Sequence, residues 1–167
     1  GVPHVHFIRD PLELIISGYQ DHLITSEKWV ITSGLQEQLR NASIEDGLEL
    51  QFQQSSKTLK HMTSIYNMSL GDPDDFFTIR LEHIRYESPF QSTMAALQKW
   101  LGKTDKVSWK QLEKCCFVSS AERSKDDKAE LRRIVMRDNG DSIRYWREKL
   151  GFPSIGLEAE GETNEAQ

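Results

Sequence analysis

The sequence predicts an α/β fold that is mostly helical and contains about two parallel strands. Three observations lead to this prediction. Residues 4–8 form a short β-prone segment that passes directly into a helix start, and residues 76–81 form a second β-prone segment. The segments that follow both of them carry apolar residues at helical spacing. Strands that alternate with helices in this way are typical of a parallel sheet covered by helices.

The composition indicates a single domain with a core of its own. The chain has 167 residues, of which 37% are hydrophobic and 28% are charged, as in soluble globular proteins. We expect this domain to occupy residues 1–153, and residues 154–167, with four glutamates and no basic residue, to form a disordered acidic tail. The net charge of -5 argues against a general nucleic-acid binder, although a local basic pocket is compatible with it. No apolar run approaches the roughly 20 residues that span a membrane.

The first strand and the helix after it come from residues 4–24. The apolar residues around Phe7 indicate a strand that is covered on both faces. Asp10 is a good N-cap, Pro11 suits the first helical position and Glu13 completes a capping-box pattern, so a helix should start there. The helix should face the sheet with a row of apolar residues, which are Leu12, Ile15, Ile16, Tyr19 and Leu23.

A second, longer helix is predicted in the middle of the chain. Ser43 is a suitable N-cap with Asp46 three residues later, and Gly71 should end the helix. Its methionine and aromatic stripe is interpreted as core rather than as a ligand site, and contains Leu48, Phe52, Leu59, Met62 and Tyr66. The preceding residues 25–41 either continue the first helix or form a connection that is broken around Gly34.

The second strand is predicted at residues 76–81, which are rich in β-forming apolar residues, and is expected to continue through Ile84. Ser88 and Pro89 then resemble an N-cap and a first helical position. A helix should follow and end at Gly102.

Three further helices are predicted in the C-terminal third. One opens at Ser108, and a second is capped by Ser124. The apolar face of the second contains Leu131, Ile134 and Val135. Asn139 and Gly140 should separate the second helix from the last, which ends at Gly151.

The candidate site lies where the first strand meets the first helix. A helix N-terminus presents free backbone N–H groups and the positive end of the helix dipole, both of which favour an anion. Arg9 adds a forked cation suited to phosphate. Ser17, seven residues after the cap at Asp10, returns to the same side of the helix after about two turns. The alternative is that Arg9 pairs with a carboxylate and that Ser17 is an ordinary helix-surface residue.

This segment, Phe-Ile-Arg-Asp-Pro followed by Ser-Gly-Tyr at residues 17–19, resembles the 3′-phosphate-binding segment of sulfotransferases. These enzymes use 3′-phosphoadenosine 5′-phosphosulfate (PAPS) as co-substrate. The resemblance implies that Arg9 and Ser17 hold the 3′-phosphate of this nucleotide.

Residues 78–102 resemble a second recurrent segment of the same family, in which an Arg-x-Glu-Asp-Leu element leads into a helix that ends in Leu-Gly. Arg80, Glu82 and the Trp-Leu-Gly ending at residues 100–102 fit this pattern, whereas His83 stands where the family commonly has an acid. We interpret Glu82 as structural, holding the loop or a neighbouring backbone amide, rather than as catalytic.

A third and weaker resemblance concerns Arg137 and Gly140, with Trp146 beyond them. The family has an Arg-Lys-Gly loop near its C-terminus that folds over the same 3′-phosphate. Here an aspartate replaces the lysine, and the glycine is displaced by one position. The resemblance implies cofactor binding by Arg137 and Gly140, and the alternative is a solvated helical surface with ion pairs.

The resemblance as a whole implies a truncated, P-loop-like three-layer sulfotransferase fold. The loop that binds the 5′-phosphosulfate and the catalytic base are expected upstream of Gly1, so the chain alone should be inactive. PAPS is then the co-substrate, and no metal is required. The acceptor partner is open between a carbohydrate, a lipid and another small molecule, with no nucleic-acid partner and no membrane segment in this chain. Cytoplasmic and Golgi-lumenal locations are both open.

Two other function classes remain open from the residues. One is a non-catalytic module that binds a nucleotide phosphate, and the other is a relative of the P-loop kinases, which share the strand–helix architecture.

Histidine and cysteine residues give little support to other sites. His4 and His6 share one strand face, but no further ligand spacing suggests a metal site. His22 is expected to be an exposed helix residue rather than a catalytic one. Cys115 and Cys116 are adjacent, which favours reduced thiols and leaves the redox compartment open.

Overall fold

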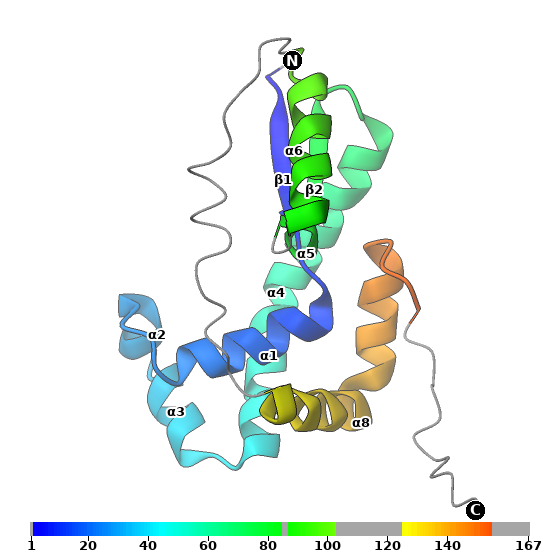
Figure 1. Cartoon of the computed structure of the whole chain (residues 1–167). Coiled ribbons are helices and arrows are strands. Elements are labelled where there is room, and N and C mark those ends of the chain that lie inside the picture. Colours follow the sequence, from blue (N-terminus) through cyan, green and yellow to red (C-terminus); the bar gives the residue numbers. More distant parts are fainter. Residues whose placement is uncertain (1, 85–86, 103–124, 155–167) are drawn as a thin grey trace, which may run out of the picture.

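The computed structural model describes residues 2–84, 87–102 and 125–154, and shows an α/β protein that is mostly helical (Figure 1). In chain order, the elements are β1 (His4–Ile8), α1 (Pro11–His22), α2 (Lys28–Thr32), α3 (Leu35–Asn41), α4 (Ile44–Gly71), β2 (Phe76–Arg80), α5 (Leu81–Ile84), α6 (Glu87–Trp100) and α8 (Lys125–Lys149).

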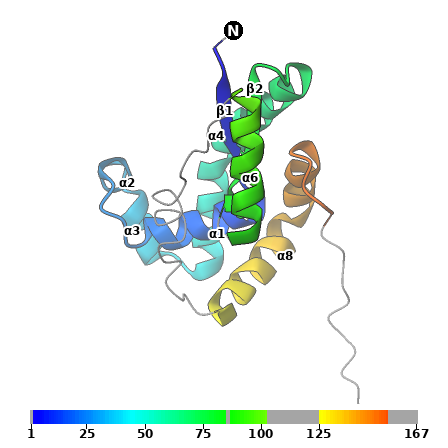
Figure 2. The same cartoon turned by 45° about the horizontal axis from the view of Figure 1, so that its top comes forward.

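The two strands form a parallel sheet that lies between two helices (Figure 2). The register pairs Ile8, the last residue of β1, with Arg80, the last residue of β2. Ile8 packs against Leu59 of α4 on one face of the sheet. Ile79 packs against Phe90 of α6 on the other. Because the strands are parallel and in register, both carboxyl ends meet at one edge of the sheet.

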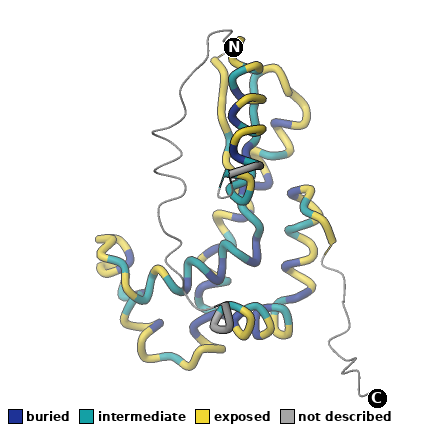
Figure 3. The backbone as a smooth tube through the Cα atoms, viewed as in Figure 1, coloured by how far each residue is buried: buried dark blue, intermediate teal, exposed yellow. Residues whose placement is uncertain are grey.

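One face of β1 is only partly covered. The side chains of Val5 and Phe7 are 39% and 50% exposed, and Figure 3 shows β1 as mostly exposed. The prediction that this strand is covered on both faces is therefore wrong for the described residues. The reason is that α6 packs on β2 and leaves the neighbouring part of the same face open.

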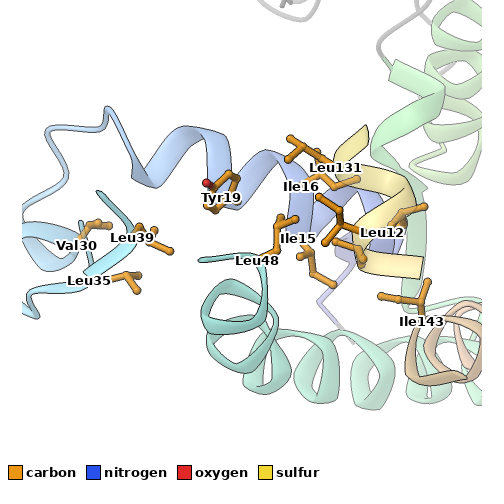
Figure 4. Close-up of a cluster of buried hydrophobic side chains, with 12 residues drawn as sticks. Leu12, Ile15, Ile16, Tyr19, Val30, Leu35, Leu39, Leu48, Leu131 and Ile143 are labelled. Atoms are coloured by element: carbon orange, nitrogen blue, oxygen red, sulfur yellow. The ribbon is translucent and has the colours of Figure 1, made fainter. Parts of the chain in front are cut away.

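The first helix begins where predicted, but it packs differently. Asp10 is its N-cap and accepts a hydrogen bond from the backbone N–H of Leu12 at 2.9 Å. The apolar face of α1 packs against α4 and α8 rather than against the sheet, which corrects the prediction. Figure 4 shows this cluster, which includes Ile15 and Ile16 of α1, Leu48 of α4 and Leu131 of α8.

The connection before the long helix is broken into α2 and α3. Gly34 lies between them with a φ of 74°, a conformation that glycine adopts easily. Ser43 then caps α4 as predicted, because its hydroxyl accepts a hydrogen bond from the Asp46 N–H at 3.1 Å. The helix ends at Gly71, also as predicted.

The prediction that β2 continues through Ile84 is wrong, because residues 81–84 form the short helix α5. β1 ends at Ile8, opposite Arg80, so a longer β2 would have no neighbouring backbone to bond. The next helix, α6, starts at Glu87, one residue before the predicted N-cap. It ends before Gly102, whose φ is 66°.

The last described helix, α8, is interrupted at Asn139, as predicted. Asn139 has the non-helical values φ −126° and ψ 16°, so it separates two helical segments that share the label α8 and run in clearly different directions (Figure 1). Gly140 follows, and glycine weakens a helix at that point. The three residues predicted for the apolar face of this segment are buried, namely Leu131, Ile134 and Val135.

Gly151 ends α8 in a Schellman motif. Its φ is 67°, its own N–H donates to the Glu148 carbonyl at 3.0 Å, and the Phe152 N–H donates to the Arg147 carbonyl at 2.9 Å. This turn folds Phe152 and Pro153 back toward the end of the helix.

Replacing Gly151 with alanine should destabilise the fold more than the same change at Gly34. Both residues have a positive φ, which costs an L-residue about 1–2 kcal/mol. A Cβ at Gly151 would also lie 2.6 Å from the Tyr66 hydroxyl, whereas one at Gly34 meets nothing closer than 3.8 Å. In urea unfolding, we expect the free energy of unfolding to fall by about 2–4 kcal/mol for Gly151→Ala and by about 1 kcal/mol for Gly34→Ala. Equal losses would contradict the tight contact.

Several predicted features lie outside the described residues. They are the helix opening at Ser108, the Ser124 cap, Cys115, Cys116 and nearly all of the acidic tail. Of the helices in the described ranges, none combines the length and the apolar character needed to cross a membrane.

Candidate functional site

Arg9 lies at the carboxyl end of β1, directly before the N-cap of α1. It is partly buried, and its backbone N–H points to the sulfur of Met62 in α4 at 3.4 Å. Arg80 ends the neighbouring strand at the same edge of the sheet. Ligands of open parallel sheets bind at this edge, outside the carboxyl ends of the strands.

Asp10 connects three parts of the chain at this edge. Its backbone N–H donates to Glu82 Oε1 at 3.0 Å, and its Oδ1 accepts from the Leu12 N–H. The structural role predicted for Glu82 is therefore confirmed. The expectation that the amides of this junction are free for an anion is wrong for Asp10 and Leu12, because protein carboxylates already accept from both.

Glu13 does not complete a capping box. The Asp10 N–H, which it would bind, is occupied by Glu82. Glu13 instead accepts from Arg132 of α8, with its Oε1 2.8 Å from Nε and 2.7 Å from Nη2. This ion pair brings a cation from the C-terminal part of the chain to α1.

Ser17 lies on the polar side of α1, as predicted. Its hydroxyl donates to the Leu14 carbonyl at 3.4 Å and is partly buried. Glu13 precedes it by four residues, which places the two side chains on the same side of the helix. The Arg132 guanidinium that binds Glu13 therefore approaches the side of α1 that carries Ser17.

Arg147 is the second arginine of α8 that reaches the junction. It forms an ion pair with the Asp10 carboxylate, and the two side chains are only 11% and 13% exposed. Its Nη2 also donates to the Pro153 carbonyl at 2.8 Å. Burial lowers the pKa of Arg147 from its ordinary value, and the Asp10 carboxylate favours the charged guanidinium.

Comparison of the chain with models of protein families, with curated proteins and with solved structures finds no match. Its function is therefore inferred from its residues and their geometry.

Arg137 and Gly140 lie on the two sides of the kink in α8 and line a shallow depression of about 310 Å³. Arg137 pairs with Asp138 at 2.6 Å, and this hydrogen bond raises the pKa of the guanidinium while lowering that of the carboxyl. Asn139, between them, donates to Glu49 of α4 at 2.9 Å. At the kink, α8 therefore contacts α4 through Asn139. The arginines of α8 that reach the β1–α1 junction are Arg132 and Arg147.

No local pattern singled out Arg132 and Arg147. Both belong to a helix with many basic and acidic residues, and their carboxylate partners are 119 and 137 positions away in the sequence. A sequence reading could detect the basic character of the helix, but not which arginines reach α1.

The histidines do not form a metal centre in the part of the chain that the structure describes, where no group of three metal-binding side chains is found. Burial lowers the pKa of His6. His4 stacks on Phe76 with the ring centroids 5.1 Å apart. Nδ1 of His22 lies 2.8 Å from Gln51 Oε1, so this histidine is a partly buried contact between α1 and α4.

Burial and the nearby charge of Glu45 raise the pKa of Tyr19 above its ordinary value. The Tyr19 ring packs against α4, where a Cβ at Gly47 would lie 2.7 Å from Cε2. We interpret this tyrosine as part of the α1–α4 packing.

Proposed function

We propose that this chain carries the 3′-phosphate-binding part of a PAPS-dependent sulfotransferase, which transfers a sulfuryl group to a hydroxyl or amine acceptor. The observation that carries the proposal is the strand–turn–helix unit itself. Arg9 leaves the carboxyl end of β1, Asp10 caps α1, and Ser17 lies two turns later on the polar side of that helix.

The charges around this unit suit an anionic ligand. Two carboxylates lie at the start of α1, where they would otherwise repel a phosphate. Asp10 is neutralised by Arg147 and Glu13 by Arg132. These two ion pairs balance the charges of Asp10 and Glu13 and so reduce their repulsion of a phosphate, while Glu82, the third carboxylate at the junction, accepts from the Asp10 N–H.

In this proposal, Arg9 and Ser17 bind the donor and perform no proton chemistry. Arg9 offers a bidentate, charge-assisted pair of donors, and the Ser17 hydroxyl would donate one more hydrogen bond on turning away from the Leu14 carbonyl. Sulfuryl transfer from the bound donor would depend on in-line positioning and charge stabilisation, as in phosphoryl transfer. No catalytic base is assigned to the described residues. Arg137 is the weaker candidate for a further contact to the same phosphate, because its guanidinium pairs with Asp138 and the neighbouring Asn139 bonds to Glu49 of α4.

Calorimetry with three nucleotides tests the proposal. Adenosine 3′,5′-bisphosphate should bind at least tenfold more tightly than adenosine 5′-monophosphate, because only the first has the 3′-phosphate that Arg9 and Ser17 recognise. ATP should bind no better than the monophosphate. Equal affinity for the bisphosphate and the monophosphate would refute the proposal, and a preference for ATP would favour a relative of the kinases.

Replacing Ser17 with alanine should weaken the binding of adenosine 3′,5′-bisphosphate by a factor of about 10 to 20, which corresponds to the loss of about 1.5 kcal/mol for one hydrogen bond to a charged group. Ser56→Ala is the matched control. The Ser56 hydroxyl also donates to a backbone carbonyl of its own helix, that of Phe52 at 3.1 Å, but it lies on α4. Its replacement should leave the affinity unchanged within about twofold, and equal losses in the two variants would contradict a phosphate contact by Ser17.

A further inference from the structure

A second candidate for anion binding is a pocket of about 480 Å³ at the end of α8. Three arginines line it, Arg80 from β2 and Arg144 and Arg147 from α8. The rest of the lining comes from Glu148 and from the turn after the helix, residues 151–154. The pocket is thus built from segments that lie far apart in the sequence, and none of its residues belongs to the pair Arg9 and Ser17.

Arg80 is held in this pocket by uncharged groups. Its Nη2 donates to the Gly151 carbonyl at 2.5 Å, and its Cζ lies 4.7 Å from the centre of the Phe152 ring. No ion pair joins Arg80 to a carboxylate within the described ranges. A buried or half-buried guanidinium without a counter-charge attracts an anion more strongly than one that is already paired.

Arg147 forms the inner wall of the pocket and has a structural role. Its charge is balanced by Asp10, its Nη2 donates to Pro153, and its Cζ lies 5.8 Å from the Phe152 ring centre. The Nε of Arg147 is buried and has no hydrogen-bond partner among the described atoms. The side chain therefore holds the turn in place while it keeps one donor unused.

Arg144 can turn toward a ligand. It pairs with Asp141, but the two side chains are 48% and 99% exposed, and such surface pairs contribute little to stability. A ligand in the pocket can therefore compete with Asp141 for this guanidinium. Glu148 is the carboxylate of the lining and opposes an anion, as do the backbone carbonyls at the end of α8. Two of those carbonyls, however, are already bonded in the Schellman motif.

The apolar part of the lining defines the rest of the ligand. Phe152 and Pro153 lie next to the arginines, so an anionic group at Arg80 and Arg144 would leave its attached carbon body against these two side chains. We propose that the pocket binds a small organic phosphate or sulfate ester, with the ester group at Arg80 and Arg144 and the apolar body at Phe152 and Pro153. This site is separate from the one in the proposed function and does not depend on it.

Calorimetric titration with phenyl phosphate, phenyl sulfate and inorganic phosphate in a chloride buffer tests the proposal. At least one of the two esters should bind saturably, and severalfold more tightly than inorganic phosphate, because the phenyl ring gains contact with Phe152 and Pro153. The stronger ester identifies which of the two groups the pocket prefers. Absence of saturable binding by both esters, or equal affinity for inorganic phosphate, would overturn the assignment.

Charge variants locate the binding site. Arg144→Gln should weaken binding of the preferred ester about tenfold, and Glu148→Gln should strengthen it severalfold. Arg133→Gln is the matched control, because Arg133 is similarly exposed on α8 and also pairs with an acid three residues away, Glu130. It should change the affinity by less than twofold. An equal loss of affinity for the ester in the Arg133 and Arg144 variants would overturn the assignment of this pocket as the binding site.

Arg80→Gln should abolish measurable binding, with folding checked by circular dichroism. If this variant does not fold, the Arg144 and Glu148 variants decide the question. Arg9→Ala separates this site from the proposed nucleotide site, because it should leave ester binding unchanged while it weakens binding of adenosine 3′,5′-bisphosphate. Loss of ester binding in Arg9→Ala, with full binding in Arg144→Gln, would place the anion at the β1–α1 junction and overturn this proposal.

Discussion

Replacement of Arg9 by alanine should weaken the binding of adenosine 3′,5′-bisphosphate about 100-fold. The guanidinium can give two charge-assisted hydrogen bonds to a phosphate, each of which contributes about 1.5 kcal/mol or more, and a loss of about 3 kcal/mol corresponds to this factor. Binding of adenosine 5′-monophosphate should change by less than about threefold, because that ligand lacks the 3′-phosphate. Calorimetry with both nucleotides measures the difference.

Two further variants control this experiment. Arg9→Lys keeps the charge but loses the forked geometry, so its affinity should fall between those of the wild type and the alanine variant. Arg40→Ala removes an arginine at the end of α3 whose Nε donates to the Leu23 carbonyl at 3.0 Å, and it should leave the affinity unchanged. Unchanged preference for the bisphosphate in Arg9→Ala would remove the basis of the sulfotransferase proposal.

Replacement of Arg147 by methionine should lower the free energy of unfolding by about 3–5 kcal/mol. Methionine keeps much of the side-chain volume but leaves the Asp10 carboxylate in a largely buried place without its counter-charge, which is the costly way to break a buried ion pair. The Pro153 carbonyl also loses its donor. Urea unfolding measures the loss, and an unchanged m-value shows that the variant still unfolds as the same compact unit.

The control Arg133→Met should lower the free energy of unfolding by less than about 1 kcal/mol, because the ion pair of Arg133 with Glu130 is exposed to solvent. Asp10→Asn in the Arg147→Met background should recover part of the loss, since it removes the charge that was left unpaired. A loss below 1 kcal/mol for Arg147→Met would show that the Asp10–Arg147 pair does not support the junction of β1, α1 and α8.

Element starts and ends were predictable because their determinants are local. Asp10 and Ser43 cap their helices through bonds to residues two or three positions away. Gly102 and Gly151 end helices because each adopts a positive φ that other residues avoid. Such signals lie within a few residues of one another and act in the same way wherever the segment packs. The parallel pairing of the two strands also followed from their apolar composition and from the helices between them.

Faces and long-range partners were decided by packing. The apolar side of α1 was predictable as apolar, but its neighbours are α4 and α8 rather than the sheet. The residues after Arg80 form α5 rather than more of the strand, because β1 ends opposite Arg80 and leaves no backbone for them to pair with. The predicted capping bond from Glu13 to the Asp10 N–H does not form, because this N–H donates to Glu82, which lies 72 positions away in the sequence.

For the candidate site, local patterns were enough to name Arg9 at a strand end and Ser17 two helical turns later. They could not show which carboxylates and arginines would gather around this unit. The pairs of Asp10 with Arg147 and of Glu13 with Arg132 form only when α8 folds against α1. These paired side chains lie more than a hundred positions apart in the sequence and meet only because whole helices pack together. The spacing of residues along the chain does not indicate which helices will pack in this way.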